Sequence, residues 1–156
     1  MVLIPILVIM ALAATDQLIK FWALGALSGG GQIRIIGDAL TLIYHENTGA
    51  AFGILQEQRF LLVGVTFLLL AGLIFLIAAR KITDRYIVWG MTLIAGGGIG
   101  NLIDRVFRGF VIDYIYFSPI NFPVFNFGDC CVVLGTILLM VYVLFLEEKL
   151  KKEKAK

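Results

Sequence analysis

The chain has 156 residues, of which 60% are hydrophobic and 15% are charged, and its formal net charge is +2. This composition excludes a soluble globular protein and is typical of an integral membrane protein. A net charge this small carries little information, so the positions of the charged residues matter more than their sum.

Four segments are long and apolar enough to cross a bilayer, which takes about 20 mostly apolar residues. The predicted spans are residues 2–22, 58–79, 86–104 and 126–146. The first span differs from a cleaved signal peptide because it lacks a basic start and carries Asp16 and Lys20 where a cleavage site needs small neutral residues. We therefore predict a single membrane domain over residues 1–156, a mostly α four-helix bundle.

Cations mark one side of the membrane. One cluster lies within residues 80–85, between the second and third spans, and another fills the tail, residues 147–156. Two crossings separate the clusters, so they share a side, which the positive-inside rule identifies as cytoplasmic. Both termini are then cytoplasmic, and residues 23–57 and 105–125 lie outside. We interpret the basic tail as an orientation signal against anionic headgroups, with no role in binding nucleic acid.

The first outer segment, with a β-rich part at about residues 30–55, has mixed character. Residues 28–31 should end the first helix, and the partial alternation of residues 33–44 predicts a short hairpin or curled sheet on the membrane surface. Residues 47–53 form a run of small side chains with an aromatic. Such a run fits a loop that contacts a substrate and fits equally well tight packing onto the second span.

Several kinds of site are disfavoured by the sequence. Cys130 and Cys131 are neighbours, too divergent on a helix for an ordinary disulfide, so both thiols should be free. With His45 as the sole histidine, a zinc or iron site lacks ligands, and we predict no metal and no cofactor. Ser28 and Ser118 have no basic partner at a readable spacing, which argues against a serine nucleophile.

Polar residues from separate segments reach one layer of the membrane. At a rise of about 1.5 Å per residue along each span, we predict that Asp16 and Asn101 lie in the outer leaflet and that Lys20 lies one turn further out. The residues predicted near the outer boundary are Asp104, Arg105, Asn126 and Asp129. Asp113 lies in the outer connection. Charge at membrane depth is costly and usually functional.

Structural explanations also fit these residues. Asp16 and Lys20 have the spacing of an ion pair within one helix, with the lysine extending to the headgroups. Asp104 is spaced for the same kind of pair with Arg108. Asn126 could simply cap the fourth span, which would place Asp129 in the first turn, where the helix dipole favours a carboxylate.

Asp113 and Asp129 are the residues for which we predict a catalytic role. Asp113 lies among apolar neighbours, away from any recognisable helix end, and at the predicted depth of Asp129. Two carboxyl groups close together in a poorly solvated site cannot easily both ionise, so one holds a proton while the other acts as a base towards water. This arrangement is that of an aspartic hydrolase.

The ordered motifs resemble those of lipoprotein signal peptidase, the bacterial signal peptidase II family. They run in order along nearly the whole chain: Asp16-x-x-x-Lys20, Asn47-x-Gly49-x-Ala51-Phe52, Gly97-Gly98-x-Gly100-Asn101-x-x-Asp104-Arg105, Gly109-x-Val111-x-Asp113-Tyr114-Ile115 and Phe125-Asn126-x-x-Asp129. Two departures are mild: Gly128 stands where the family usually has alanine, and Tyr114 where phenylalanine is common.

The resemblance implies an aspartic endopeptidase that removes the signal peptide from prolipoproteins whose cysteine carries a diacylglyceryl group. Asp113 and Asp129 would form the catalytic dyad. The resemblance further implies a small outer sheet with a helix that cradles the peptide, membrane lipids as partners, a monomer, and a site facing outward from the bacterial cytoplasmic membrane. Supporting or substrate-binding roles would fall to Asp16, Lys20, Asn47, Gly49, Asn101, Asp104, Arg105 and Asn126.

Two other classes of protein remain as alternatives. In a small proton-coupled transporter or channel subunit, carboxylates would relay protons across the whole membrane. The sequence offers none in the inner halves of the second, third and fourth spans. In a non-catalytic assembly protein the carboxylates would be structural, and replacing Asp113 or Asp129 by asparagine would leave processing of a lipid-modified peptide unchanged.

Overall fold

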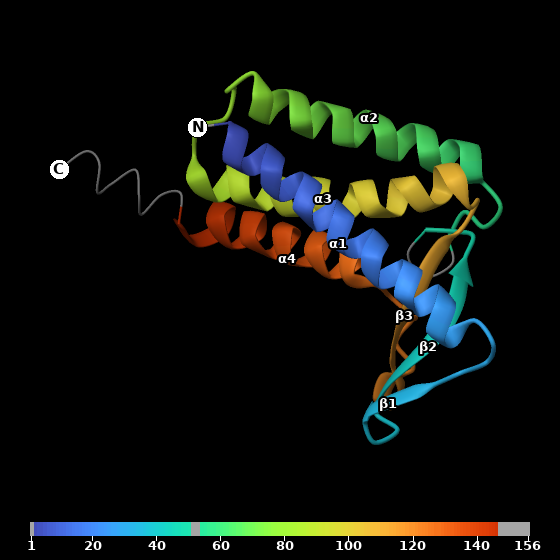
Figure 1. Ribbon diagram of the computed structural model, residues 1–156. Coiled ribbons are helices and arrows are strands. Elements are labelled where there is room, and N and C mark those ends of the chain that lie inside the picture. Colours follow the sequence, from blue (N-terminus) through green and yellow to red (C-terminus); the bar gives the residue numbers. More distant parts are fainter. Residues whose placement is uncertain (1, 51–53, 147–156) are drawn as a thin grey trace.

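The computed structural model describes residues 2–50 and 54–146, which form a bundle of helices with a small sheet at one end (Figure 1). Within these residues, four helices are long and apolar enough to span a membrane. They are α1 (Leu3–Leu27), α2 (Arg59–Ala78), α3 (Arg85–Phe107) and α4 (Phe127–Val141), which continues as a π-helical turn over Tyr142–Leu146. The predicted fold class is confirmed. The tail, residues 147–156, lies outside the described residues.

Two helices extend beyond the predicted spans. α1 continues from residue 22 to Leu27 because alanine and leucine, which favour helix, outnumber Gly25 there, and it ends at the glycines that follow Ser28. α3 continues from residue 104 to Phe107, and Gly109 then adopts a left-handed φ of 91°. Glycine is suited to that conformation because it has no Cβ. Hydropathy marks the apolar thickness of a span, whereas caps and glycines set its ends.

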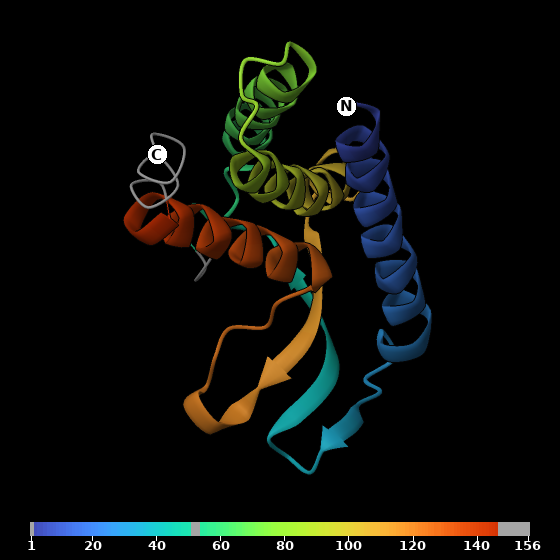
Figure 2. The same cartoon turned by 90° about the vertical axis from the view of Figure 1, so that its left-hand side faces the viewer.

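α3 is the central helix of the bundle and packs against α1, α2 and α4 (Figure 2). Its glycines let neighbouring helices approach closely, as small residues do in membrane proteins. A Cβ on Gly97 would lie 2.2 Å from the carbonyl oxygen of Gly128 at the start of α4. A Cβ on Gly100 would lie 2.2 Å from a carboxylate oxygen of Asp16 in α1. The glycine-rich stretch therefore determines how near α1 and α4 come to α3.

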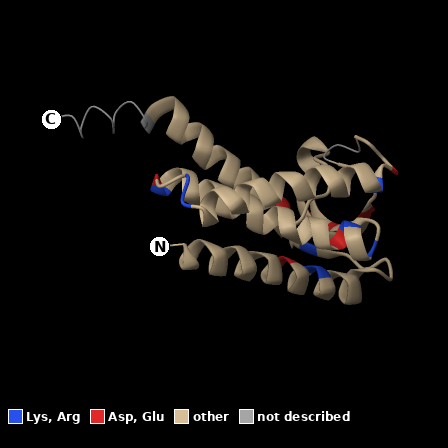
Figure 3. Cartoon of the chain, turned by 90° about the horizontal axis from the view of Figure 1, so that it is seen from above, with Lys and Arg blue, Asp and Glu red and all other residues tan. Residues whose placement is uncertain are grey.

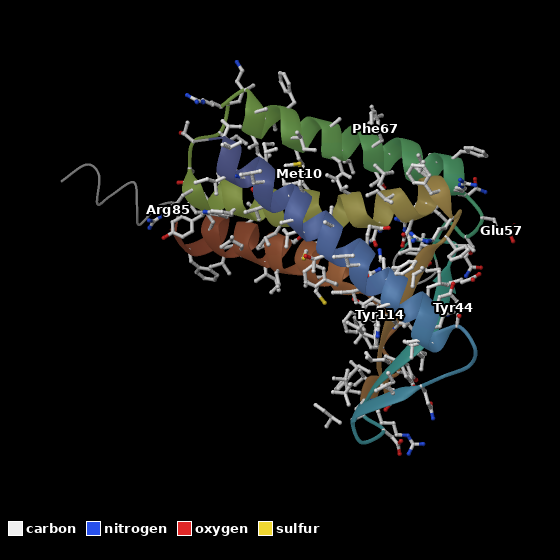
Figure 4. All side chains as sticks on the ribbon, viewed as in Figure 1. Met10, Tyr44, Glu57, Phe67, Arg85 and Tyr114 are labelled. Atoms are coloured by element: carbon white, nitrogen blue, oxygen red, sulfur yellow. The ribbon has the colours of Figure 1, made fainter. Side chains whose placement is uncertain are left out.

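Apolar side chains cover both the inside and the outside of the bundle. A buried cluster that includes Ile9, Leu70 and Met91 holds the helices together. Met10 and Phe67 lie on the periphery (Figure 4), with 54% and 58% of their surfaces exposed. Charged residues lie at the end of the bundle near the N-terminus and in the half towards the sheet, with an uncharged stretch between the two groups (Figure 3). This distribution is what a bilayer requires of a spanning bundle.

The sheet combines both predicted outer segments. It is antiparallel with the order β1 (Ile33–Ile36), β2 (Leu40–Asn47) and β3 (Val111–Phe117). β1 and β2 form the predicted hairpin, and β3 is a third strand that we did not predict, because its run of apolar residues lacks the alternation of an exposed strand. No described residue between Leu27 and Arg59 forms the helix implied by the resemblance; residues 51–53 lie outside the described residues.

β3 packs beneath the end of α1. Ala23 and Leu27 of α1 form a second buried cluster with Ile112 and Tyr114 of β3. A short 3-10 helix, Ser118–Ile120, follows the strand, and the chain then returns to the start of α4. Phe125 bridges back to Ile115, so the return segment runs beside β3. The strand and the return segment thus bring Asp113 and Asp129 to the same end of the bundle.

Candidate active site where the sheet meets the bundle

The predicted site residues converge from five elements on the junction between the sheet and the helices. Asp113 lies on β3, Asp129 in the first turn of α4, and Asn47 at the end of β2. The remaining predicted residues are Asp16 and Lys20 of α1, Gly49 after β2, Asn101, Asp104 and Arg105 of α3, and Asn126 before α4.

Asp113 is 1% exposed and held by two amides. Its Oδ1 accepts a hydrogen bond from Asn126 Nδ2 at 2.6 Å, and its Oδ2 accepts one from Asn47 Nδ2 at 3.0 Å. Burial raises the pKa of Asp113 to about 6, and the nearby charge of Asp129 adds to the increase. A buried carboxyl group in this environment holds a proton more readily than an ordinary aspartate does.

Asp129 is half-buried and forms a capping box with Asn126. Its Oδ2 accepts a hydrogen bond from the Asn126 N–H at 3.0 Å, while the Asn126 Oδ1 accepts one from the Asp129 N–H at 2.9 Å. The predicted N-cap is confirmed. Asp129 Oδ1 accepts a further hydrogen bond, from Asn101 Nδ2 at 2.8 Å. Capping therefore fixes the carboxylate in place beside α3.

The first turn of α4 is held at further points. The Phe127 N–H donates to the Tyr114 hydroxyl at 3.1 Å, and the Gly128 N–H donates to Asp16 Oδ1 at 2.8 Å. A helix start leaves such N–H groups without partners inside the helix, and here β3 and α1 supply the acceptors. Tyr114, one of the two departures from the family pattern, thus has a structural role in fixing the helix that carries Asp129.

Lys20 lies at the centre of a buried ion cluster. Its Nζ is 2.7 Å from Asp16 Oδ2 and 3.1 Å from Asp104 Oδ2, and all three side chains are 0% exposed. The predicted Asp16–Lys20 pair is confirmed, but Lys20 does not extend towards the headgroups, because carboxylates from two helices and the Asn101 Oδ1, 2.7 Å away, hold it inside. The predicted Asp104–Arg108 pair is also present.

The ion cluster touches the proposed dyad through Asn101. Asn101 Oδ1 accepts hydrogen bonds from Lys20 Nζ and, at 3.1 Å, from Asn126 Nδ2, while its own Nδ2 donates to Asp129. Asp104 Oδ2 accepts from the N–H of Ile112 at 3.1 Å, next to Asp113 on β3. The same cluster therefore fixes both the strand and the helix of the site.

Two residues that support the site were missed from the sequence. Arg59, at the start of α2, donates to the carbonyl oxygens of Arg105 at 2.7 Å and Val106 at 2.6 Å. Gln17 donates to the Gly100 carbonyl oxygen at 3.0 Å and to the carboxylate of Asp104 at 3.1 Å. Each carries a signal that could have found it: Arg59 is a cation at the predicted outer end of a span, and Gln17 is a polar residue inside an apolar run.

A cavity of about 740 Å³ opens beside these groups. Arg105 lines it and donates to the Gly49 carbonyl oxygen at 2.9 Å, which ties α3 to the loop after β2. One part of the wall is polar and is formed by Asn47, Asn101, Arg105, Asp113 and Asp129. Another part is apolar and includes Val124, Phe125, Cys130, Val132 and Val133. Both proposed catalytic carboxyl groups line the same space.

The polar groups that line this cavity are mainly carboxylates, amides and one guanidinium group, together with the His45 imidazole, the Tyr116 hydroxyl and the Cys130 thiol. Among residues 2–50 and 54–146, no three His, Cys, Asp or Glu side chains gather where they could share a metal ion. Cys130 and Cys131 are free thiols, as predicted. The donors and acceptors aimed into the cavity suit a polar chain such as a peptide, and the apolar wall suits hydrocarbon.

Comparisons with known proteins identify relatives of the chain. A family model described as signal peptidase (SPase) II matches residues 8–145. A lipoprotein signal peptidase of Clostridioides difficile (strain 630) is 43% identical over 144 residues, covering 92% of this chain and 97% of the relative. One of Clostridium novyi (strain NT) is 42% identical over 132 residues, covering 83% of this chain and 89% of the relative.

The fold is also similar to that of a solved structure described as a bacterial membrane enzyme. The TM-score is 0.80 at 28% sequence identity, and the match covers 90% of this chain and 87% of that one. The family model extends from α1 to the turn after α4, so it includes every element that contributes to the cavity. This multi-pass membrane protein therefore belongs to the signal peptidase II family.

Proposed function

We propose that this chain is an aspartic endopeptidase that removes the signal peptide from prolipoproteins carrying a diacylglyceryl-modified cysteine. Its relatives are lipoprotein signal peptidases by name. The observation that carries the aspartic mechanism is that Asp113 and Asp129, 16 residues apart in the numbering, line one cavity and are both hydrogen-bonded to Asn126. That is the setting in which one proton and one water can be shared.

The environments of the two carboxyl groups favour different roles. Asp113 is buried and its pKa is raised to about 6, so it takes up a proton more readily than an ordinary aspartate and suits the role of the acid. Asp129 is half-buried, accepts N–H donors from Asn126 and Asn101, and lies at a helix N-terminus, where the dipole favours negative charge. We assign Asp129 as the base that activates water, with Asp113 as the acid.

In the proposed reaction, every proton that Asp113 or Asp129 gives or takes is later returned. Asp129 takes a proton from the water as the water oxygen forms a bond to the peptide carbonyl carbon, and Asp113 gives its proton to the carbonyl oxygen. The resulting gem-diol collapses when the carbon–nitrogen bond breaks. Asp129 then passes its proton to the leaving amine, and Asp113 regains one from the hydroxyl that becomes the new carboxyl group. Both residues return to their starting states.

The rest of the cavity supports substrate binding. The guanidinium group of Arg105 has several N–H donors and uses one to bind the Gly49 carbonyl oxygen. We propose that another N–H donor binds a peptide carbonyl in the same way. The apolar wall formed by Val124, Val132 and Val133 would accommodate acyl chains of the modified cysteine. We propose that the lipid lies along α4 while the scissile bond reaches the dyad. Every proposed group comes from one chain, which fits a monomer.

The distribution of charge supports an outward-facing site. The N-terminus and the connection between α2 and α3 lie at one end of the bundle, and the sheet lies at the other (Figure 1). That connection carries Arg80, Lys81 and Arg85. By the positive-inside rule it is cytoplasmic, so we place the N-terminus inside and the sheet and cavity outside.

The decisive experiment compares cleavage by variants of the purified full-length protein in lipid. Asp113→Asn and Asp129→Asn should each slow cleavage of a diacylglyceryl-modified precursor by about 10²- to 10⁴-fold, the usual contribution of an acid or base. Asp38→Asn is the matched control, because the Asp38 side chain is 85% exposed on the β1–β2 hairpin. Wild-type rates in both dyad variants would refute the mechanism. Equal cleavage of an unmodified precursor would refute the substrate class alone.

A further inference from the structure

A second cavity lies at the end of the bundle opposite the proposed active site. Its volume is about 290 Å³, and it is formed by the start of α1, the end of α2 and the first turns of α3. The polar part of its lining is Arg80, Thr83 and Arg85, while Pro5, Ile77, Val88 and Trp89 contribute to the apolar part. The cavity therefore combines a basic rim with a hydrocarbon floor.

The rim is positively charged and contains no acidic residue. The Arg80 side chain is exposed and makes no hydrogen bond or ion pair within residues 2–50 and 54–146. Arg85 (Figure 4) donates one hydrogen bond, to the Tyr86 hydroxyl at 2.8 Å, and lies 4.7 Å from the centre of that ring. A guanidinium group has five N–H donors, so both arginines can bind an anion.

Asp84, the acidic residue next to Arg85 in the sequence, is bonded to other groups. Its Oδ1 accepts from the N–H groups of Tyr86 and Ile87, which caps α3, and its Oδ2 accepts from the Tyr142 hydroxyl at 2.9 Å. Asp84 does not line the cavity. Among residues 2–50 and 54–146, therefore, no acidic side chain at the rim offsets the two arginine charges.

Arg80 occupies a backbone position that normally belongs to glycine. α2 ends in a Schellman motif: the Arg80 N–H donates to the Ile77 carbonyl oxygen at 3.2 Å, and the Lys81 N–H donates to that of Leu76 at 3.1 Å. The residue after the cap adopts a left-handed conformation, and Arg80 has a φ of 53°. An arginine there is less favourable than glycine, so its presence is better explained by its side chain than by the turn.

We propose that this cavity binds an anionic phospholipid, with the phosphate on Arg80 and Arg85 and the glycerol and first methylene groups on the apolar floor. Trp89 is 40% exposed at the edge, and tryptophan is enriched at the level of lipid headgroups. Basic pockets between spanning helices are a recognised setting for anionic headgroups. Such a lipid would tie the start of α1 to the connection between α2 and α3.

Binding can be measured by the increase in unfolding temperature of the full-length protein in a neutral detergent as phosphatidylglycerol is added. Arg80→Gln and Arg85→Gln should each weaken the apparent affinity by about fivefold. Lys81→Gln is the matched control, because Lys81 is the neighbouring cation, carries the same charge and does not line the cavity. Phosphatidylcholine should protect much less. None of these changes should alter precursor cleavage at saturating lipid.

Arg80→Gly separates lipid binding from folding. Glycine suits the left-handed position, so the variant should be at least as stable as the wild type without lipid, yet its apparent affinity for phosphatidylglycerol should fall by about fivefold, as in Arg80→Gln. Equal protection of Arg80→Gly and wild type would overturn the proposal, as would an equal loss in Lys81→Gln. Full protection by glycerol phosphate alone would show a free-phosphate site and would also overturn it.

Discussion

Asn126 Nδ2 lies 2.6 Å from Asp113 Oδ1, and the same asparagine caps the helix that carries Asp129. One side chain thus performs two tasks: its amide nitrogen orients the strand carboxyl group, and its amide oxygen accepts the Asp129 N–H at 2.9 Å. The relative position of the proposed acid and base depends on a helix cap. Changes at Asn126 should therefore affect catalysis and helix stability together, and suitable variants should separate them.

Asn126→Ala is expected to lose both functions. Loss of an N-cap costs about 1 kcal/mol of stability, and the misplaced dyad should slow cleavage by at least about 10²-fold. Asn126→Ser keeps an oxygen for the cap but cannot donate to Asp113 in the same way, so it should recover stability and remain slow in cleavage.

The control is Asp84→Ala, which removes the cap of α3 far from the site. It should cost similar stability and leave the cleavage rate near that of the wild type. Unfolding temperatures and cleavage rates measured on the same preparations check this. A fast Asn126→Ser variant would contradict the orienting role.

Stability should depend on pH through Asp113. Its folded-state pKa, about 6, lies above the ordinary value of 3.8, so the folded protein binds this proton more tightly than the unfolded chain does. The resulting stabilisation is fully present below pH 3.8 and is lost as the pH rises through about 6. The difference corresponds to about 3 kcal/mol at 1.36 kcal/mol per pKa unit.

The measurement is the unfolding temperature of wild type and Asp113→Asn between pH 4 and pH 8. The stability of the variant relative to the wild type should increase over that range. Because the charge of Asp129 contributes to the raised pKa of Asp113, Asp129→Asn should reduce the pH dependence without abolishing it. Parallel curves for wild type and Asp113→Asn would show that Asp113 does not titrate in this range.

Lys20→Met should destabilise the protein strongly. The substitution leaves Asp16 and Asp104 buried without their shared cation, and breaking a buried pair from one side costs about 3–5 kcal/mol. Adding Asp16→Asn to Lys20→Met removes one of the stranded charges and should restore part of the loss. Arg34→Met breaks an exposed pair with Asp38 and should change the unfolding midpoint little. A double variant less stable than Lys20→Met would argue against charge as the cause.

Gly97→Ala should push α3 and α4 apart. The added Cβ would lie 2.2 Å from the Gly128 carbonyl oxygen, a backbone atom that cannot move without shifting the helix start. Overpacking of this kind costs about 1–3 kcal/mol, and the shift should also slow cleavage because Asp129 follows Gly128. Gly64→Ala is the control: nothing lies within 4 Å of its Cβ position, and alanine favours a helix by up to about 1 kcal/mol. Wild-type stability and rate in Gly97→Ala would contradict the close approach.

Several features could be predicted because they depend on neighbouring residues. The four spans follow from runs of apolar side chains, and the Asp16–Lys20 pair and the Asn126 cap follow from spacing along one helix. Motif order was enough to suggest the family before any coordinates. That the polar residues of separate helices lie at a similar level along the bundle followed from the constant rise of a helix. Each of these properties can be read within a short window of the chain.

Other features depend on residues that are distant in sequence. β3 was missed because Val111–Phe117, apart from Asp113, carries apolar and aromatic side chains on both faces, and only its pairing with β2 and its packing under α1 make it a strand. Lys20 was expected near the headgroups because its second carboxylate, Asp104, comes from another helix. Arg59 could be noticed as a cation at the end of a span, but its partners could not be predicted, because they are backbone carbonyl oxygens of α3, which no side-chain pattern reveals.

The amino-acid sequence is enough to predict a four-span membrane protein with a set of carboxylates, amides and cations at one level. The pairs that these groups form appear only in the folded protein: Asn126 with Asp113, Asn101 with Asp129, and Lys20 with two carboxylates. The difference arises because the composition of each segment sets its preference for lipid, whereas hydrogen bonds extend only about 3 Å. Which groups come that close depends on how glycines, caps and strand pairing bring separate segments together.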